Sequence, residues 1–547
     1  MNPVTSTEID DPARQSPDPP ERNFERVGRV GPTGIALIDR SSVITIPRKT
    51  PVPATRWPVD AEHLCAEMHQ EGRTLVDTNR SGSLTSAEIG ARLDRLPLSG
   101  KSRWVLVAMA SAFFFEFADQ TVLGLVAPSL RSHLGLSLDD IALLVAATYG
   151  SLLIGSVAGG SLADRIGRLP VIRWGLIVAS LGSACHAFTE TLPQLFAMRI
   201  VAGIGMGAMY ITSITYVIEL SPSKKRGSRA SLTNLLGMVG VVAVALGARF
   251  ILPTGPNGWR VLFLLCASGL LLLFVLYRLP ESPLWLASRG RLDAAETSLR
   301  TLERSAAENG PLPALEVPAS ATAGEQTSNL SFIQRFSALF GGGLLIPTVL
   351  LIATWLVYST ISQIFNSWMP TILQVRGFSE ETLLTITTVS LFGAPLGALL
   401  AYLFVDRFDR SKFLAIVTGS AAVCGLLFGI APQAALIAIA GFGHTVLLGC
   451  FAPILNTVMA ESFPSNLRTT GSGLAFGSGR LSNLIVPFTV AIVISTLGYA
   501  IVGWYVLIAW LVVAALLVPL SIYNTKRLAR LSPSVDTSEN SAGALLS

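Results

Sequence analysis

Four ionisable side chains stand inside long apolar runs of this sequence. Glu116 and Asp119 share one run, Arg199 lies in another and Arg480 in a third. A charge at the centre of a membrane helix costs about 2.5–3.5 kcal/mol, so each of these residues is a candidate functional group. The three-residue spacing places the two acids on neighbouring faces of one helix, where they could bind and release protons.

Arg480 differs from the acids because it predicts a ligand. If its helix begins near Thr470, the side chain lies about 15 Å along it, close to the middle of a bilayer. A guanidinium at that depth suggests an anion, since its planar fork matches a carboxylate. The alternative is a structural partner for an acid of the bundle. Other polar or aromatic groups that could contact a small molecule are Gln363, Asn366, Trp368, Tyr149 and Asn456.

Composition narrows the class of protein. Of the 547 residues, 51% are hydrophobic and 14% are charged, against about 25% charged in an average soluble protein. Residues 1–100 hold 26 of the 75 charged residues, so the remaining body is poorer still. This excludes an ordinary soluble enzyme, a nucleic-acid-binding protein and a secreted disulfide scaffold. We expect neither a cofactor nor a resident metal.

Twelve apolar runs are each long enough to cross about 30 Å of hydrocarbon. We therefore expect an all-α membrane protein with twelve transmembrane helices. The polar segment 1–100 is predicted to be largely disordered, with a short amphipathic helix after a Thr85–Glu88 capping box. The remaining predicted parts are a six-helix bundle at 101–279, a central loop at 280–343, a second bundle at 344–523 and a tail at 524–547. We place the runs at 104–127, 141–163, 171–189, 193–217, 231–252, 259–279, 344–368, 383–405, 413–432, 434–460, 470–495 and 498–523.

Lysine and arginine residues gather in alternate loops. Examples are the pairs Arg165 and Arg168, Lys224 and Lys225, and Lys526 and Arg527. Since basic loops stay in the cytoplasm, both termini and the central loop are predicted to be cytoplasmic. No apolar signal-peptide core lies in the first hundred residues, so the first run would act as an uncleaved anchor.

The two halves of the chain repeat each other at a constant offset. Asp164-Arg165…Arg168 recurs 242 residues later as Asp406-Arg407…Arg410. The same offset relates Glu219…Arg226 to Glu461…Arg468, and Pro128-x6-Gly135-x-Ser137 to Pro370-x6-Gly377-x-Ser379. We infer a duplicated six-helix unit, the plan of many secondary transporters, whose substrate site lies between the halves.

The segment Gly160-Ser-Leu-Ala-Asp164-Arg165-Ile-Gly167-Arg168 resembles the loop signature of the major facilitator superfamily. In that family the cluster latches a cytoplasmic gate. The second copy lacks the leading glycine and carries Asp409 in place of the second one. The resemblance implies two pseudo-repeated six-helix bundles, a monomer, and the gating residues Gly160, Asp164, Arg165, Gly167, Arg168, Glu219, Arg226, Asp406, Arg410, Glu461 and Arg468.

Three further segments resemble particular branches of the superfamily. Pro280-Glu-Ser-Pro-Leu-Trp-Leu286 is similar to a signature of sugar porters and organic-ion transporters. Glu116-Phe-Ala-Asp119 resembles the Asp-Gly-x-Asp pattern of aromatic-acid/proton symporters, with Phe117 in the glycine position. Gly477-Ser-Gly479-Arg480 resembles a run in aromatic-acid and organic-anion transporters, where the arginine binds the substrate anion.

The fourth segment bears on coupling. Arg199-x3-Gly203-x-Gly205-x-Gly207 resembles a helix-4 signature of the superfamily. In proton-coupled sugar porters a helix-1 aspartate pairs with a helix-4 arginine and links protonation to conformational change. The resemblance thus assigns proton coupling to Asp119 and Arg199, with Glu116 beside them; the alternative is a static buried ion pair.

Three hypotheses remain open at this stage. The first is a proton-coupled symporter of a small organic acid, with aromatic carboxylates as one candidate, in a bacterial plasma membrane. The second is a proton-coupled sugar or polyol porter. The third is a non-transporting sensor with a calcium-binding tail, because Asp77–Glu88 fits the twelve-residue loop of an EF-hand.

Overall fold

The computed structural model describes residues 36–39, 42–45, 85–315, 332–341, 343–404, 410–464 and 467–531. The predicted disorder of the first sixty residues falls almost entirely outside these ranges, as do residues 77–84 of the calcium loop, Asp406 and the last sixteen residues. Strand β1 (Ala36–Asp39) pairs antiparallel with β2 (Ser42–Thr45), so a short hairpin forms within the segment predicted to be largely disordered. Residues 1–82 form a unit separate from residues 83–547.

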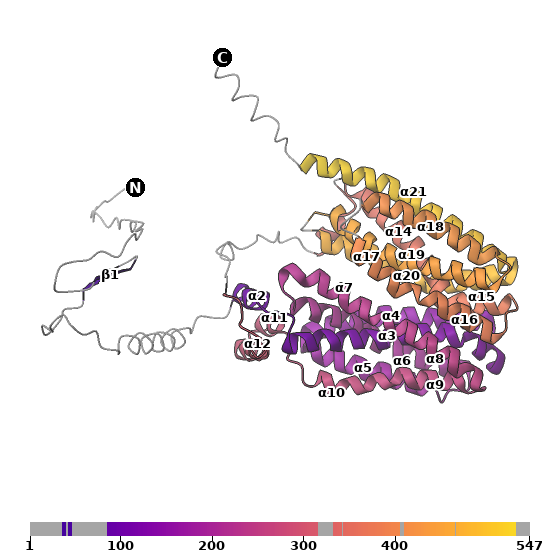
Figure 1. Cartoon of the computed structure of the whole chain (residues 1–547), viewed down its shortest axis with the longest axis horizontal. Coiled ribbons are helices and arrows are strands. Elements are labelled where there is room, and N and C mark those ends of the chain that lie inside the picture. Colours follow the sequence, from indigo (N-terminus) through magenta and orange to yellow (C-terminus); the bar gives the residue numbers. More distant parts are fainter. Residues whose placement is uncertain are drawn as a thin grey trace, which may run out of the picture. The chain divides into compact units, whose positions relative to one another are not determined.

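Twelve helices of the second unit are long and apolar enough to cross a membrane, which confirms the predicted all-α membrane fold. The chain makes two groups of helices, coloured indigo to magenta and orange to yellow in Figure 1. The first group comprises α3 (Gly100–Leu134), α4 (Leu138–Ile166), α5 (Arg168–His186), α6 (Leu192–Glu219), α7 (Arg226–Gly237), α8 (Val239–Ile251), α9 (Gly258–Ala267) and α10 (Leu273–Leu276). The second comprises α14 (Leu345–Gln363), α15 (Met369–Val375), α16 (Glu380–Leu391), α17 (Gly393–Phe404), α18 (Arg410–Ile430), α19 (Ala434–Ser462), α20 (Arg468–Leu497) and α21 (Ala500–Leu531).

The internal repeat appears in the local structure of the two halves. Gly135 ends α3 with φ 66°, and Gly377 follows α15 with φ 90°, a left-handed conformation that favours glycine. Two residues later Ser137 and Ser379 cap the next helix, each accepting a hydrogen bond from a backbone N–H in the first turn. Equivalent turns 242 residues apart therefore position α4 and α16 in the same way. We call the end of the bundles that holds these two turns the opposite face. The other end, where α3 begins, is called the terminal face.

The seventh span is longer than predicted and changes its winding. A π-helical turn at Ile364–Trp368 joins α14 to α15, which continues to Val375 rather than ending at residue 368. Proline lacks an N–H and its ring would clash with the carbonyl of the preceding turn. The wider π turn relieves that clash and leaves Pro370 in the first turn of α15, where no N–H is needed.

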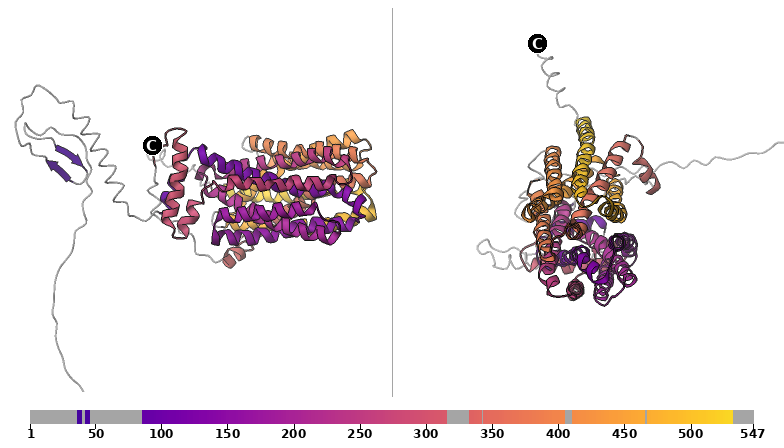
Figure 2. Two further views of the ribbon diagram at one scale, coloured as in Figure 1. Left: turned by 90° about the horizontal axis from the view of Figure 1, so that it is seen from below. Right: turned by 90° about the vertical axis from the view of Figure 1, so that its right-hand side faces the viewer.

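The predicted central loop is partly helical and carries a small helical layer at the terminal face. This layer consists of α2 (Ser86–Asp94), α11 (Pro283–Ser288) and α12 (Leu292–Ala307), seen together at one end of the first bundle in Figures 1 and 2. A third helix of the loop, α13 (Phe332–Ala338), follows in the chain. Helix α2 lies where the capping box predicts a helix, and Thr85 caps it by accepting the N–H of Glu88 at 3.2 Å.

Ion pairs hold α2 against α12. The guanidinium of Arg92 contacts Glu296 and Glu303 at 2.6 Å each, and Arg95 reaches Glu303 at 2.5 Å. Burial acts to raise the pKa of Glu303, but its hydrogen bonds from Arg92 and Arg95 outweigh burial and lower it. The segment preceding the first span is therefore fastened to the central loop.

Candidate functional site

Asp119 and Arg199 form a buried ion pair inside the first bundle. One guanidinium nitrogen of Arg199 lies 2.8 Å from Oδ2 of Asp119, and another donates to the Asp119 carbonyl at 2.8 Å. The third nitrogen, Nε, donates to the hydroxyl of Thr148 at 2.8 Å. Arg199 is fully buried and the Asp119 side chain is 5% exposed, so α3, α4 and α6 enclose both charges. The sequence-predicted pair is brought together.

Helix α5 adds two polar residues that sequence reasoning missed. Ser183 donates to Oδ1 of Asp119, so both carboxylate oxygens are engaged. His186, one turn later, interacts with the charges of Asp119 and Arg199 and stacks on Phe263 with ring centroids 4.6 Å apart. The available signal was the i, i+3 spacing of polar residues along the third apolar run.

Glu116 and Arg480 lie close to each other where the two bundles meet. Glu116 is 2% exposed; its Oε1 accepts from Gln120 at 2.8 Å, while Oε2 has no hydrogen-bond partner. The charge of Arg480, on α20 of the second bundle, attracts that of Glu116 at longer range, since the two described side chains form no ion pair. The Arg480 guanidinium sits over the ring of Tyr210 on α6 at 5.2 Å and over Phe476 at 5.4 Å. This is a cation flanked by aromatic faces and one carboxylate.

The other predicted ligand-contacting residues divide into two sets. Tyr149 interacts with Ser367 and Gln363 across the bundle interface and with the charges of Arg199 and Arg480. Gln363 is 2% exposed and its Nε2 has no partner. These two residues therefore join the neighbourhood of Arg480.

Three candidates lie differently. Asn366 donates to Ser362 of its own helix at 2.9 Å, inside the π turn. Trp368 is fully buried, so it packs inside the protein and does not anchor a helix at the lipid surface. Asn456 is exposed on α19. Of the five predicted ligand-contacting residues, only Tyr149 and Gln363 therefore lie near the charged groups.

Hydrogen bonds and ion pairs join the two bundles at the opposite face. Arg131 donates to the side-chain oxygen of Gln374 at 2.8 Å, and the Gln374 amide donates to the Pro128 carbonyl at 3.2 Å. Ser129 donates to Glu380 at 3.0 Å, and Arg249 pairs with Glu381 at 2.6 Å. These contacts hold the opposite face closed in this structure.

Close backbone approach at Gly124 is part of the same closure. A Cβ there would lie 2.6 Å from the backbone oxygen of Ser367 in the other bundle, and a backbone cannot move aside cheaply. We expect Gly124→Ala to push the bundles apart at this point and to favour an arrangement in which the opposite face opens. Spin labels on otherwise cysteine-free protein at His133→Cys and Val375→Cys should then report a longer distance distribution.

A matched control for Gly124→Ala is Gly419→Ala. Gly419 lies on α18, where an added Cβ meets no atom within 4 Å, so this variant should keep the wild-type distribution. An unchanged distribution in Gly124→Ala would contradict the role of the close approach.

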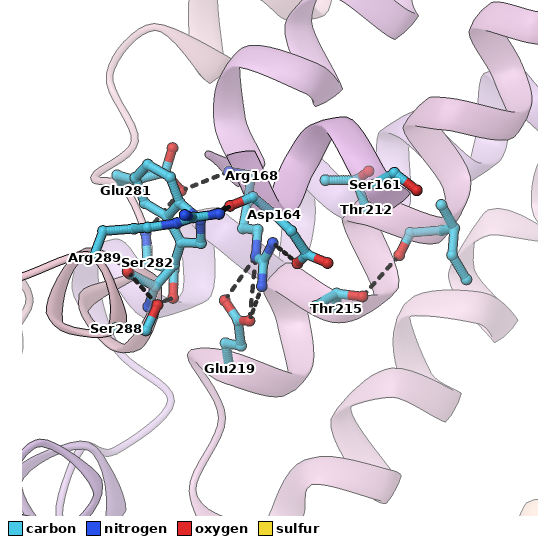
Figure 3. A network of polar contacts seen from close by, with 12 residues as sticks. Ser161, Asp164, Arg168, Thr212, Thr215, Glu219, Glu281, Ser282, Ser288 and Arg289 are labelled. Atoms are coloured by element: carbon cyan, nitrogen blue, oxygen red, sulfur yellow. Dashed lines mark hydrogen bonds and ion pairs between the residues drawn. The ribbon is translucent and has the colours of Figure 1, made fainter. Parts of the chain in front are cut away.

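A network at the terminal face centres on Arg168 (Figure 3). Its guanidinium contacts Asp164 at 2.6 Å and Glu219 at 2.8 Å, linking α4, α5 and α6. Glu281 accepts the backbone N–H groups of Arg168 and Leu169 at 3.1 Å each, and so satisfies the first turn of α5. Burial raises the pKa of Glu281, although its backbone donors partly offset this.

The remaining gate residues differ from the expected pattern in several ways. Arg226 donates to the Ser221 carbonyl at 3.4 Å, while Glu219 pairs with Arg168. Close helix approach occurs at Gly159, where an added Cβ would collide with Ala208, and not at the neighbouring Gly160 of the loop signature. Gly167 is needed for another reason, because it has φ 112° and a Cβ there would lie 2.7 Å from Glu281. Arg165, Glu461 and Arg468 are exposed, and Asp406 and the Arg410 side chain lie outside the described residues.

Twelve membrane-spanning helices in two repeated halves, with buried charges where the halves meet, define a transporter of the major facilitator class. Residues 106–528 match the family described as "Sugar (and other) transporter", and the chain belongs to that family. It is therefore a multi-pass membrane transporter and not an enzyme. Among the described residues, His, Cys, Asp and Glu form no group of three or more that could hold a metal.

Known relatives are transport proteins of similar length. The chain is 34% identical to "Putative metabolite transport protein YyaJ" of Bacillus subtilis (strain 168), over 75% of this chain and 89% of the relative. It is 27% identical to "4-hydroxybenzoate transporter PcaK" of Pseudomonas aeruginosa, over 73% of this chain and 87% of that protein. Among solved structures, a D-xylose-proton symporter shares the fold with a TM-score of 0.60 at 20% identity, covering 76% of this chain and 97% of that one.

Proposed function

We propose that this protein is a proton-coupled symporter of a small organic acid, with aromatic carboxylates as the first candidates. It would work by alternating access as a monomer in a bacterial plasma membrane, with both termini in the cytoplasm. The observation that carries the proposal is Arg480, a cation flanked by the rings of Tyr210 and Phe476 beside the bundle interface. A carboxylate could pair with the guanidinium while its ring packs on the same aromatic faces.

The buried pair Asp119–Arg199 supports the coupling part of the proposal. Two buried charges are costly to desolvate, so they must stay paired or be neutralised. Protonation of Asp119 would weaken its pairing with Arg199 and let α3, α5 and α6 shift relative to one another. A relative named for 4-hydroxybenzoate supports the substrate class.

A sugar or polyol porter is the second candidate. The segment Pro280–Leu286 favours it, and so does the description of the matched family. A neutral sugar would leave Arg480 without a counter-charge from the substrate, which favours the acid.

Uptake into proteoliposomes tests the two proposals together. With a lower pH outside, we expect purified protein to speed initial 4-hydroxybenzoate uptake well above protein-free liposomes and to leave xylose unaffected. A protonophore should remove the stimulation. Uptake indifferent to the protonophore would contradict proton coupling, and xylose uptake in place of the acid would favour the porter.

A further inference from the structure

A small cavity inside the first bundle lies beside the buried pair. Its volume is about 20 Å³, and its lining includes the oxygen-bearing side chains of Glu116, Asp119, Ser180 and Ser183. Cavities of this size can hold one water molecule when two to four polar groups surround it. Met206, Met209 and Cys266 form part of the apolar lining. The cavity therefore has the size and polarity of a single-water site.

One acceptor in that lining lacks a partner. Both carboxylate oxygens of Asp119 are engaged, by Arg199 and by Ser183. Oε2 of Glu116 has no partner although the side chain is 2% exposed. A buried oxygen left unsatisfied costs about 1–3 kcal/mol, so a water or a proton at Oε2 would stabilise the site.

Helix α5 continues the polar line toward the opposite face. His186 is the last residue of α5 and lies one turn beyond Ser183. Its Nδ1 is 2.8 Å from the Gly182 carbonyl, which can only accept, so Nδ1 carries the hydrogen. Its Nε2 is then free to accept a proton, and no described group bonds to it.

We propose that Asp119 takes up a proton inside the first bundle and passes it through one cavity water to Glu116. This proposal rests on the proposed proton-coupled function. In the last step the water accepts the Asp119 proton and donates its own to Oε2 of Glu116, so no proton is gained or lost. Neutral Glu116 no longer competes for Arg480, and a substrate carboxylate takes its place as counter-ion.

Charged and titratable groups around this path come from every neighbouring helix. Arg199 on α6 and His186 on α5 interact with Asp119, whose charge also reaches the Cys266 thiol on α9. Arg480 on α20 and Tyr210 on α6 act on Glu116. Glu116 and Asp119 lie one turn apart on α3 and both line the cavity, so negative charges on the two acids would repel each other.

Filling the cavity separates proton delivery from substrate binding. Cys266→Val adds roughly one methyl group to the lining, whereas Cys185→Val makes the same change at an exposed position of α5, away from the cavity. We expect Cys266→Val to slow pH-gradient-driven 4-hydroxybenzoate uptake at least tenfold but to keep its exchange at equal pH within twofold, because exchange needs no proton release. Cys185→Val should match wild type in both assays. Equal gradient-driven uptake in the two variants, or loss of exchange in Cys266→Val, would overturn the cavity's role.

Glu116→Gln provides a second, independent measurement. Wild-type affinity for 4-hydroxybenzoate should rise as pH falls, because protonated Glu116 leaves Arg480 free. The amide cannot ionise, so the variant should bind with one affinity from pH 5 to pH 8. A wild-type pH dependence in Glu116→Gln would overturn the proposal, whereas wild-type uptake that ignores a pH gradient would instead refute the proposed function.

Discussion

Asp119→Asn should abolish proton-driven uptake of the substrate while leaving exchange intact. An amide neither gains nor releases a proton in this range, so it cannot transmit a pH gradient. One pH unit is worth about 1.4 kcal/mol per proton, or a tenfold driving force. We expect the initial rate of 4-hydroxybenzoate uptake in proteoliposomes to become the same with and without the gradient.

Stability provides a second measurement on the same variant. Arg199 is fully buried, and loss of its counter-charge leaves an uncompensated cation, which costs about 3–5 kcal/mol. The melting temperature of the purified variant should therefore fall. Asp139→Asn, on the exposed first turn of α4, makes the same chemical change without touching a buried pair and should leave both readouts unchanged. Gradient-stimulated uptake in Asp119→Asn would refute this aspartate as the coupling group.

Arg480→Ala should weaken substrate binding more than any other single change in this site. Truncating one partner of a buried charge pair costs about 2–5 kcal/mol, so KM for the anion should rise at least about 30-fold. The same change removes the cation that lies over Tyr210 and Phe476. Arg480→Lys keeps the charge but loses the planar fork of the guanidinium. Its KM should therefore lie between those of the wild type and Arg480→Ala.

Initial-rate transport and equilibrium binding of 4-hydroxybenzoate measure this effect. Arg278→Ala is the control, because Arg278 is exposed just after α10. If Arg480→Ala bound the anion normally, Arg480 would not be part of the anion site. If the variant lost xylose uptake instead, the sugar-porter proposal would gain support.

Hydropathy and spacing along the chain were sufficient to predict the fold. Twelve apolar runs, a 242-residue offset and the loop signature each reflect local sequence, because a span must satisfy its own backbone hydrogen bonds within the membrane. The same reasoning selected Glu116, Asp119, Arg199 and Arg480, since charges within spans are rare enough to stand out.

Partner choice was less accessible from sequence. Glu219 pairs with Arg168 and not with Arg226, and Glu281 caps α5 although it lies more than a hundred residues away. The close approach at Gly159 instead of Gly160 depends on how α4 is rotated against α6. A shift of one residue turns a helix face by about 100°. Motif position alone cannot resolve that rotation.

The sequence by itself determined that this is a duplicated twelve-helix membrane protein with a few charges inside its spans. Only the tertiary structure decided which groups those charges meet. It brought Ser183 and His186 of α5 to Asp119, and it set Arg480 of one bundle against Tyr210 of the other. Spans form from local hydrogen bonds and apolar periodicity, whereas side-chain neighbours between helices depend on the packing of the whole bundle.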